Sequence, residues 1–287
     1  MTLLMQKQPC ETQFIVRGQK IAAKIWDNPS GMPTLALHGW LDNAATFDKL
    51  APLLSHCHIV AVDLPGHGHS DHKPPSSYLH FMDFVLDMME LTQVLGWDKF
   101  ALLGHSLGGA ISSIMAGAVP EKILKVVVID GLGPLTTPAD HAPMQLRLYL
   151  NETSAKKSNP STYRTLEEAI QTRLKVSAMH ESSARLIVER GLKQNEDSTY
   201  SWRTDPRLLK PSALQLTEEQ TLAFFREITA PMAIIRPEPG FPFPAEIIKR
   251  RVAAIEHLQI HRIHGLHHVH LDDALGVADY VNRFFVD

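Results

Sequence analysis

A serine lies in a pattern typical of catalytic nucleophiles, Gly104–His105–Ser106–Leu107–Gly108. The apolar run Phe100–Leu103 precedes this pattern, and an Ala-, Ile- and Met-rich helical segment follows it. A G-x-S-x-G nucleophile needs this context, because the serine occupies a strained strand-to-helix turn that lifts its hydroxyl off the sheet. A side chain at 104 or 108 would press on neighbouring backbone, so glycine fits both positions. The pattern predicts Ser106 as a nucleophile.

A neutral serine needs a base to take its proton, and in proteins with this turn a histidine near the C-terminus does so. The last predicted strand, Leu258–Ile263, is followed by a histidine-rich stretch. His267 lies in the loop after that strand, from which it could reach the carboxyl edge of a sheet. His268 and His270 remain alternatives at this point.

A third group should be a carboxylate that holds the imidazole in the right tautomer. The usual place is the loop after the strand Met232–Ile235, which offers Glu238 and no aspartate. The other option is Asp130, which ends the apolar strand Val126–Ile129 at the same predicted edge as Ser106. Placement at a ligand-binding edge favours Asp130 over Glu238.

Acyl transfer develops a negative oxygen, which preorganised backbone amides can stabilise. One expected donor is the amide of Leu107, directly after the nucleophile. The second is the amide of Trp40, which follows Gly39 in the loop after the predicted strand Thr34–Leu37. The Trp40 ring is free to pack elsewhere, because ring and amide are separate groups.

Six histidines between residues 257 and 270 raise the question of a metal site. His257 and His261, and likewise His264 and His268, are four residues apart, as metal ligands on a helix would be. A strand is predicted there, however, and it would splay these rings apart. We therefore expect no metal, and solvated histidines at positions 257, 261 and 264.

Short apolar runs alternate with helical patterns along much of the chain, which predicts an α/β fold with a parallel sheet. Two runs around Arg17–Gly18–Gln19 predict a hairpin. Helices are expected over the segment from Phe81 to Leu95, with Gly96 as its stop, around Ala245–Ile255, and at the C-terminus. The predicted strands are Phe14–Val16, Ile21–Ile25, Thr34–Leu37, His58–Val62, Phe100–Leu103, Val126–Ile129, Met232–Ile235 and Leu258–Ile263.

The alternation stops after Ile129, and residues 134–228 read only as helix or loop, with a loop at 155–160. This predicts an α/β core of residues 1–133 and 229–287, with a helical cap inserted at 134–228. Apolar side chains at Met144, Leu146, Leu148 and Tyr149 could line a pocket, but we expect them to form the cap's own core.

Composition narrows the class of protein. The 287 residues include 28 Lys and Arg against 31 Asp and Glu, a net charge of −3, so no basic excess favours a nucleic-acid partner. Two cysteines suit a reducing compartment, and no apolar run is long enough to span a membrane. The short patch Leu3–Met5 is not a signal-peptide core. We expect a cytoplasmic protein with a small-molecule partner.

Taken in order, these motifs resemble the α/β-hydrolase superfamily and, within it, the serine hydrolase-like group. The resemblance implies an eight-stranded, mostly parallel sheet with a helical cap after strand six, and it implies no cofactor. It implies Ser106 as nucleophile, Trp40 and Leu107 as oxyanion donors, and His267 as base, five residues ahead of Asp272. The matching segments are His38–Ala44, Asp63–Ser70, Gly104–Gly109, Tyr200–Leu208 and His267–Asp272.

The chain departs from the family pattern after strand seven, where Gly240 stands in place of an aspartate. Dehalogenase-like relatives place the acid after strand six, which matches Asp130. Epoxide hydrolases and haloalkane dehalogenases carry an aspartate at the position of Ser106, so the serine argues against both activities.

The expected activity is cleavage of carboxylic esters or related acyl compounds through a Ser–His–acid triad and an acyl-enzyme. C–C bond hydrolysis or perhydrolysis by the same triad is the alternative, because substrate selectivity would reside in the cap. A non-catalytic ligand-binding protein on the same scaffold is a third possibility, supported only by the absent aspartate after strand seven.

Overall fold

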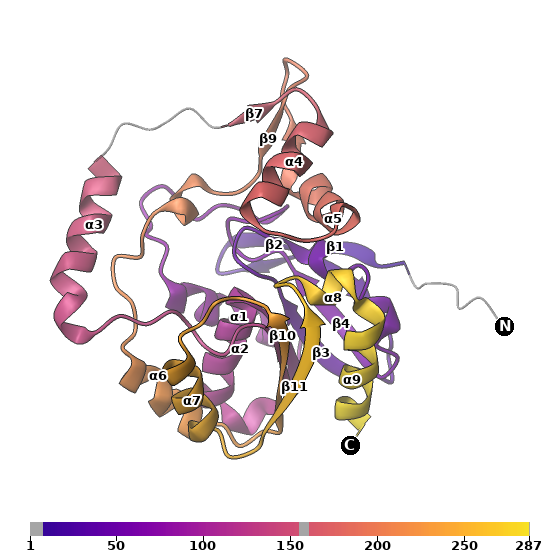
Figure 1. Cartoon of the computed structure of the whole chain (residues 1–287). Helices are drawn as coiled ribbons and strands as arrows, with labels where there is room; N and C mark the ends of the chain where they lie inside the picture. Colours follow the sequence, from indigo (N-terminus) through magenta and orange to yellow (C-terminus); the bar gives the residue numbers. More distant parts are fainter. Residues whose placement is uncertain (1–7, 155–160, 287) are drawn as a thin grey trace.

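The computed structural model describes residues 8–154 and 161–286 (Figure 1). The loop predicted at 155–160 and the apolar patch Leu3–Met5 lie outside this part of the chain. Eight strands form one sheet in the order β1-β2-β4-β3-β5-β6-β10-β11. Their bounds are β1 Cys10–Val16, β2 Gln19–Trp26, β3 Met32–Leu37, β4 Cys57–Val62, β5 Phe100–His105, β6 Ile123–Ile129, β10 Met232–Pro239 and β11 Leu258–Gly265.

The sheet is mostly parallel, as predicted. Strands β4, β3, β5, β6, β10 and β11 run parallel to one another, whereas β1 and β2 form an antiparallel hairpin and β2 pairs antiparallel with β4. The hairpin turns at Arg17 and Gly18, whose φ angles of 49° and 76° match the tight turn that suits twisted strands. The predicted α/β class and the eight-stranded sheet are confirmed.

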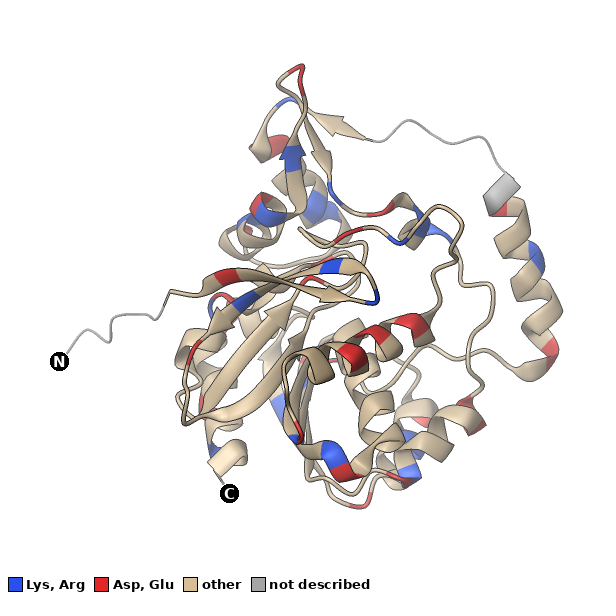
Figure 2. Cartoon of the chain, turned by 180° about the vertical axis from the view of Figure 1, so that it is seen from behind, with Lys and Arg blue, Asp and Glu red and all other residues tan. Residues whose placement is uncertain are grey.

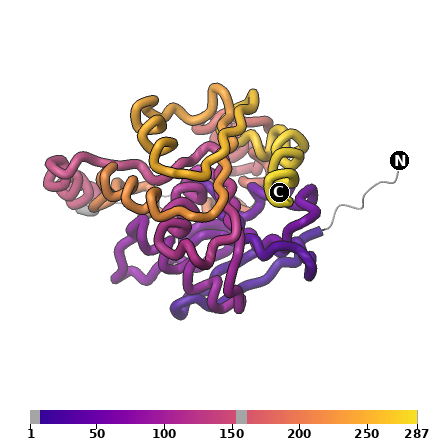
Figure 3. The backbone as a smooth tube through the Cα atoms, turned by 90° about the horizontal axis from the view of Figure 1, so that it is seen from below, coloured from indigo at the N-terminus to yellow at the C-terminus, as the bar shows by residue number. Residues whose placement is uncertain are grey.

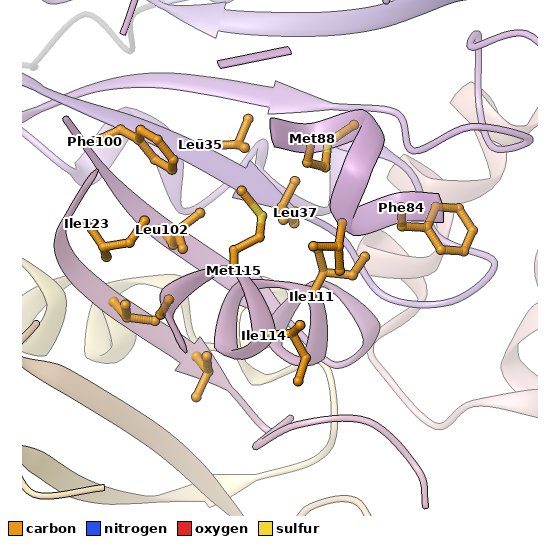
Figure 4. Close-up of a cluster of buried hydrophobic side chains, with 14 of the residues drawn as sticks. Leu35, Leu37, Phe84, Met88, Phe100, Leu102, Ile111, Ile114, Met115 and Ile123 are labelled. Carbon is orange, nitrogen blue, oxygen red and sulfur yellow. The ribbon is translucent and has the colours of Figure 1, made fainter. Parts of the chain in front are cut away.

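Helices cover both faces of the sheet, because neighbouring residues of each central strand bury their side chains on opposite sides. Leu102 belongs to the core that includes residues of α1, α2 and α6, and Leu103 belongs to the core that includes residues of η1 and α9. Figure 4 shows the first of these cores, with β3 and β5 side chains meeting those of α1 and α2. The helices are α1 Phe81–Val94, α2 Leu107–Ala118, α3 Ala142–Ser154, α4 Leu166–Val176, α5 Glu181–Gly191, α6 Glu218–Arg226, α7 Ala245–Ala254, α8 Val269–Asp272 and α9 Ala274–Val286, with short 3₁₀ turns η1 Ala44–Phe47, η2 Ala51–Leu53, η3 Pro120–Lys122, η4 Ala139–His141 and η5 Pro206–Leu209.

The segment between β6 and β10, called the insertion below, contains α3 to α6 and also a small antiparallel sheet in the order β7-β9-β8. Its strands are β7 Thr162–Tyr163, β8 Leu192–Gln194 and β9 Tyr200–Trp202. The prediction of helix and loop alone was therefore wrong for this sheet. Strands of two or three residues are too short to show an alternating pattern.

Helices α4 and α5 share an apolar core with β8, to which Leu271 from α8 also contributes. Helix α6 instead packs against α2, and its Phe225 belongs to the main core beside the sheet. The division into core and cap at residues 134 and 228 stays a prediction.

Helix α3 lies at the edge of the molecule, away from the sheet (Figures 1 and 3). Met144, Leu146 and Leu148 are each nearly half exposed and take no part in the α4–α5 core. The expectation that they form the cap's own core was wrong. Apolar side chains at helical spacing did not reveal that this face of α3 stays largely exposed.

Charged residues of both signs are distributed along the helices, loops and outer strands (Figure 2). Within residues 8–154 and 161–286, no helix is long and apolar enough to cross a membrane.

Candidate active site

Ser106 stands between the end of β5 and the first residue of α2, with φ 51° and ψ −112°. This left-handed backbone is strained for a residue with a Cβ and turns the chain sharply from strand to helix. A Cβ at Gly104 would lie 2.4 Å from the Gly108 carbonyl oxygen, and one at Gly108 would lie 1.9 Å from the Leu37 carbonyl oxygen. The turn therefore requires glycine at both positions, and it leaves Ser106 partly exposed at the carboxyl edge of the sheet.

His267 and Asp130 meet at this edge, although 137 residues separate them. The His267 Nδ1 atom lies 2.6 Å from Asp130 Oδ2, and because a carboxylate only accepts, Nδ1 carries the proton and donates it. The Phe241 amide also donates to Asp130 Oδ2, at 2.6 Å. Asp130 directly follows β6 with φ 47°, a conformation that aspartate tolerates better than most residues.

The other carboxylate considered, Glu238, does not approach His267. Its side chain is exposed and pairs with Arg262 on the neighbouring strand β11. Crowding around Gly240 explains why no aspartate occupies this position after β10. A Cβ there would lie 2.5 Å from the Pro237 carbonyl oxygen and 3.1 Å from both Asp130 carboxylate oxygens. An aspartate at 240 would thus compete for the space that the Asp130 side chain fills.

The two alternative histidines are engaged elsewhere. His268 is buried, with its Nε2 atom 3.0 Å from Asp42 Oδ2. His270 is fully buried below the site, with its Nε2 atom 2.8 Å from the Thr46 hydroxyl. Only His267 of the three keeps an exposed side chain, about a fifth of its surface.

His105 connects the serine turn to the histidine loop. It immediately precedes Ser106, its ring centroid lies 4.6 Å from that of His267, and its Nε2 atom lies 2.9 Å from the His267 carbonyl oxygen. Burial lowers the pKa of His105 to about 3, so the ring is neutral and its one proton is on Nε2. Among the described residues no hydrogen bond joins the Ser106 hydroxyl to the His267 ring. Such bonds commonly tighten only when substrate is present.

The loop after β3 is also held against the serine turn. The Gly108 amide donates to the His38 carbonyl at 3.0 Å, and the Leu64 amide donates to His38 Nε2 at 2.9 Å. The amides of Trp40 and Leu107 make no hydrogen bond within the described residues. The Trp40 side chain is half exposed and donates from Nε1 to the Leu208 carbonyl of the insertion at 3.1 Å.

Sequence reasoning missed a buried group around Asp42. This carboxylate contacts His268, Arg173 of α4 and His105. Burial alone would raise the pKa of Asp42, but the neighbouring His268 and Arg173 side chains hold it well below its usual value. Asp42 and His268 lie in the segments His38–Ala44 and His267–Asp272, which match the family, and this could have pointed to them. Nothing in the sequence around Arg173 marked that residue.

The histidines considered as metal ligands are separated in the structure. His261 stacks on Tyr280 with ring centroids 4.1 Å apart, while His257 and His264 are exposed and His268 is buried. Donor atoms of Asp42, His105 and His268 do lie within 4.8 Å of one another. The Arg173 guanidinium already supplies the positive charge that Asp42 needs, so this group is a hydrogen-bonded ion network.

Buried neutral histidines make the fold sensitive to acid. Burial lowers the pKa of both His67 and His105 to about 3. In the unfolded chain these rings take up protons near pH 6.5, so stability is full above that pH and falls as the pH drops toward 3. Between pH 7 and pH 5 we expect the two groups together to lower the free energy of unfolding by about 4 kcal/mol.

Urea unfolding at both pH values measures this effect. Asp42 and Asp63 do not mask it, because their lowered pKa values put their own loss of stability below pH 4. A His67→Gln variant keeps a donor for the Pro65 carbonyl and should reduce the pH dependence by about 2 kcal/mol, the contribution of one such ring. An unfolding midpoint that is the same at pH 7 and pH 5 would contradict the assignment.

Comparison with known proteins agrees with this architecture. Residues 34–225 match the family model described as the alpha/beta hydrolase fold. A probable serine hydrolase of Drosophila melanogaster is 32% identical over 92% of this chain and 84% of that protein, and a serine hydrolase-like protein of Dictyostelium discoideum is 29% identical over 94% and 79%. A crystal structure of a hypothetical protein from Pseudomonas aeruginosa PAO1 is 37% identical, with a TM-score of 0.91 over 96% of this chain and 99% of that one. The chain belongs to the α/β-hydrolase fold family and, within it, to the serine hydrolase-like group.

Proposed function

We propose that the protein is a serine hydrolase that cleaves carboxylic esters or related acyl compounds, with Ser106 as nucleophile, His267 as base and Asp130 as the acid. The observation that carries this proposal is the 2.6 Å contact between His267 Nδ1 and Asp130 Oδ2, in a loop bonded to the residue before Ser106. It supplies the oriented, charge-stabilised imidazole that a serine nucleophile requires.

The reaction follows from the tautomer. Because His267 keeps its proton on Nδ1, where it donates a hydrogen bond to Asp130, the Nε2 atom has a free lone pair that can accept the Ser106 proton. The serine oxygen then bonds to the acyl carbon, and the leaving alcohol takes the proton back from Nε2 as its bond breaks. Water then attacks the acyl-enzyme while His267 Nε2 takes its proton, and return of that proton to the serine oxygen releases the carboxylic acid and restores Ser106. Asp130 remains ionised throughout and stabilises the imidazolium.

The backbone amides of Trp40 and Leu107 are the proposed donors to the oxyanion. Neither amide makes another hydrogen bond within the described residues. Leu107 is the first residue of α2, where backbone amides lack a partner within the helix. The bond from the Gly108 amide to the His38 carbonyl fixes the two loops relative to each other. Donors held in this way need no rearrangement as charge develops.

The insertion is the proposed cap that selects a small-molecule acyl substrate. Its Leu208 carbonyl holds the Trp40 ring, and Trp40, Phe241 and Leu266 expose apolar surface beside the proposed triad. The Phe241 ring centroid lies 5.4 Å from that of His267. The cytoplasmic location expected from the two cysteines, both free thiols, stays a prediction.

A fluorophosphonate probe tests the nucleophile directly. The folded protein should bond the probe phosphorus to the Ser106 oxygen with loss of fluoride, and mass spectrometry should locate the adduct on Ser106. Heat-unfolded protein should not react, because the probe needs an activated hydroxyl. Folded protein without an adduct at Ser106 would instead favour the non-catalytic ligand-binding function.

A further inference from the structure

Four parts of the molecule meet at the buried carboxylate of Asp42. Asp42 lies in the loop that carries Trp40, His105 directly precedes Ser106, His268 directly follows His267, and Arg173 comes from α4 of the insertion. The Asp42 Oδ2 atom lies 3.0 Å from His268 Nε2 and 3.6 Å from His105 Nδ1, while Oδ1 accepts from Arg173 Nη2. All four side chains are less than a tenth exposed.

These contacts hold the backbone on which His267 stands. The His267 carbonyl accepts from His105 Nε2 at 2.9 Å, and the next side chain along, His268, donates to Asp42. The remaining His268 nitrogen, Nδ1, accepts from the Ser177 hydroxyl at the end of α4, 3.3 Å away. The His267 ring is therefore anchored on one side by Asp130 and on the other by a network that includes the insertion.

We propose that Asp42 and Arg173 are positioning residues, which hold the His267 loop against the serine turn and so make the base depend on docking of α4 of the insertion. The inference rests on the proposed function for its catalytic consequence, but the placement of the His267 loop can be measured separately. Neither residue touches the proposed reacting atoms, and both act through His268, which is hydrogen-bonded to Asp42.

Arg173 is essential to this arrangement for an electrostatic reason. A buried carboxylate is stable as an anion only when opposite charge and donors surround it. Without the guanidinium, the buried Asp42–His268 pair must take up a proton, either on the carboxylate or on the imidazole. Either change alters the Asp42–His268 contact. The geometry of the loop that carries His267 changes with it.

The insertion offers a matched control in Arg190 of α5. Arg190 also makes a buried pair with a core carboxylate, its Nε lying 3.0 Å from Asp63 Oδ1. Through Asp63 that pair reaches the Ala44 and His69 amides, and Arg190 also pairs with Glu11. Within the described residues, neither side chain of the pair makes a hydrogen bond or ion pair with the loop that carries His267. Arg173→Met and Arg190→Met thus remove equivalent charges from the same insertion, and only the first is connected to His267.

Proton NMR of the His267 Nδ1 proton is the first readout. A short imidazole–carboxylate bond gives a far-downfield resonance, which Asp130→Asn should abolish and thereby assign. We expect Arg173→Met to shift or broaden this resonance, Arg190→Met to leave it in place, and Arg173→Lys to restore it in part. A resonance identical in wild type and Arg173→Met would overturn the proposal, whatever the protein catalyses.

Turnover of p-nitrophenyl acetate, counted per fluorophosphonate-labelled site, is the second readout. We expect Arg173→Met to lower kcat at least tenfold with KM within twofold, and Arg190→Met to keep kcat per labelled site within twofold. If Arg173→Met does not fold, Asp42→Leu/Arg173→Met avoids a lone buried charge and still removes the His268 contact. Wild-type kcat per labelled site in the folded Arg173 variant would overturn the proposal, whereas an unlabelled wild type would overturn only the proposed hydrolase function.

Discussion

Replacing Ser106 with alanine is expected to lower kcat/KM for a short-chain ester on the order of 10⁴-fold or more. Alanine can occupy the left-handed turn as well as serine does, because the two side chains share the same Cβ. The variant should therefore keep its fold and lose only the hydroxyl that forms the acyl-enzyme. Activity against p-nitrophenyl acetate, together with the melting temperature, measures both properties.

Ser112 provides the control for this substitution. It lies in α2, six residues after the nucleophile, and its buried hydroxyl has no hydrogen-bond partner among the residues that the structure describes. Ser112→Ala should therefore leave kcat/KM within twofold of wild type. Full ester turnover by a folded Ser106→Ala protein would show that another group is the nucleophile.

Asp130→Asn is expected to lower kcat by about 10⁴-fold while the protein stays folded. The amide has nearly the shape of the carboxylate and can still accept from the Phe241 amide. It cannot stabilise the imidazolium, however, and its NH₂ group can select the tautomer that leaves no lone pair on His267 Nε2. The loss should appear in kcat and in the rate of fluorophosphonate labelling, since both require an activated Ser106.

Glu238→Gln is the matched comparison for Asp130→Asn. Glu238 was the other carboxylate considered from the sequence, and in the structure it pairs on the surface with Arg262. Its replacement should change kcat less than twofold, because Glu238 does not approach His267 and exposed ion pairs contribute little to folding stability. The opposite outcome, a loss in Glu238→Gln and none in Asp130→Asn, would move the acid to the end of β10.

Much of the sheet could be predicted because its signals are local. The continuous apolar runs at β3, β4, β5 and β6 indicated strands buried on both faces, and the structure places their successive residues in two different cores. Gly18 marked a turn that needs a positive φ, and Gly104 and Gly108 marked a turn too crowded for a Cβ at either position. In each case the segment carries enough information in a few neighbouring residues.

The insertion was predicted less well because its structure depends on contacts between distant segments. The strands β7, β8 and β9 are too short for a pattern, and they exist because they pair with one another across the insertion. Helix α3 is amphipathic in composition, yet it packs too little to bury Met144, Leu146 or Leu148. Apolar content alone does not reveal whether a helix has a partner.

By itself the sequence determined the fold class, the strained turn at Ser106 and the histidine-rich loop that follows the last strand, since all of these are properties of short segments. Only the tertiary structure decided which carboxylate contacts His267, why His268 and His270 face other partners, and that Asp42 gathers Arg173 into the same network. Arg173 and Asp42 are 131 residues apart, and His268 and Asp42 are 226 apart. Local spacing does not encode the direction of a side chain at the end of a strand, because packing against distant segments sets it.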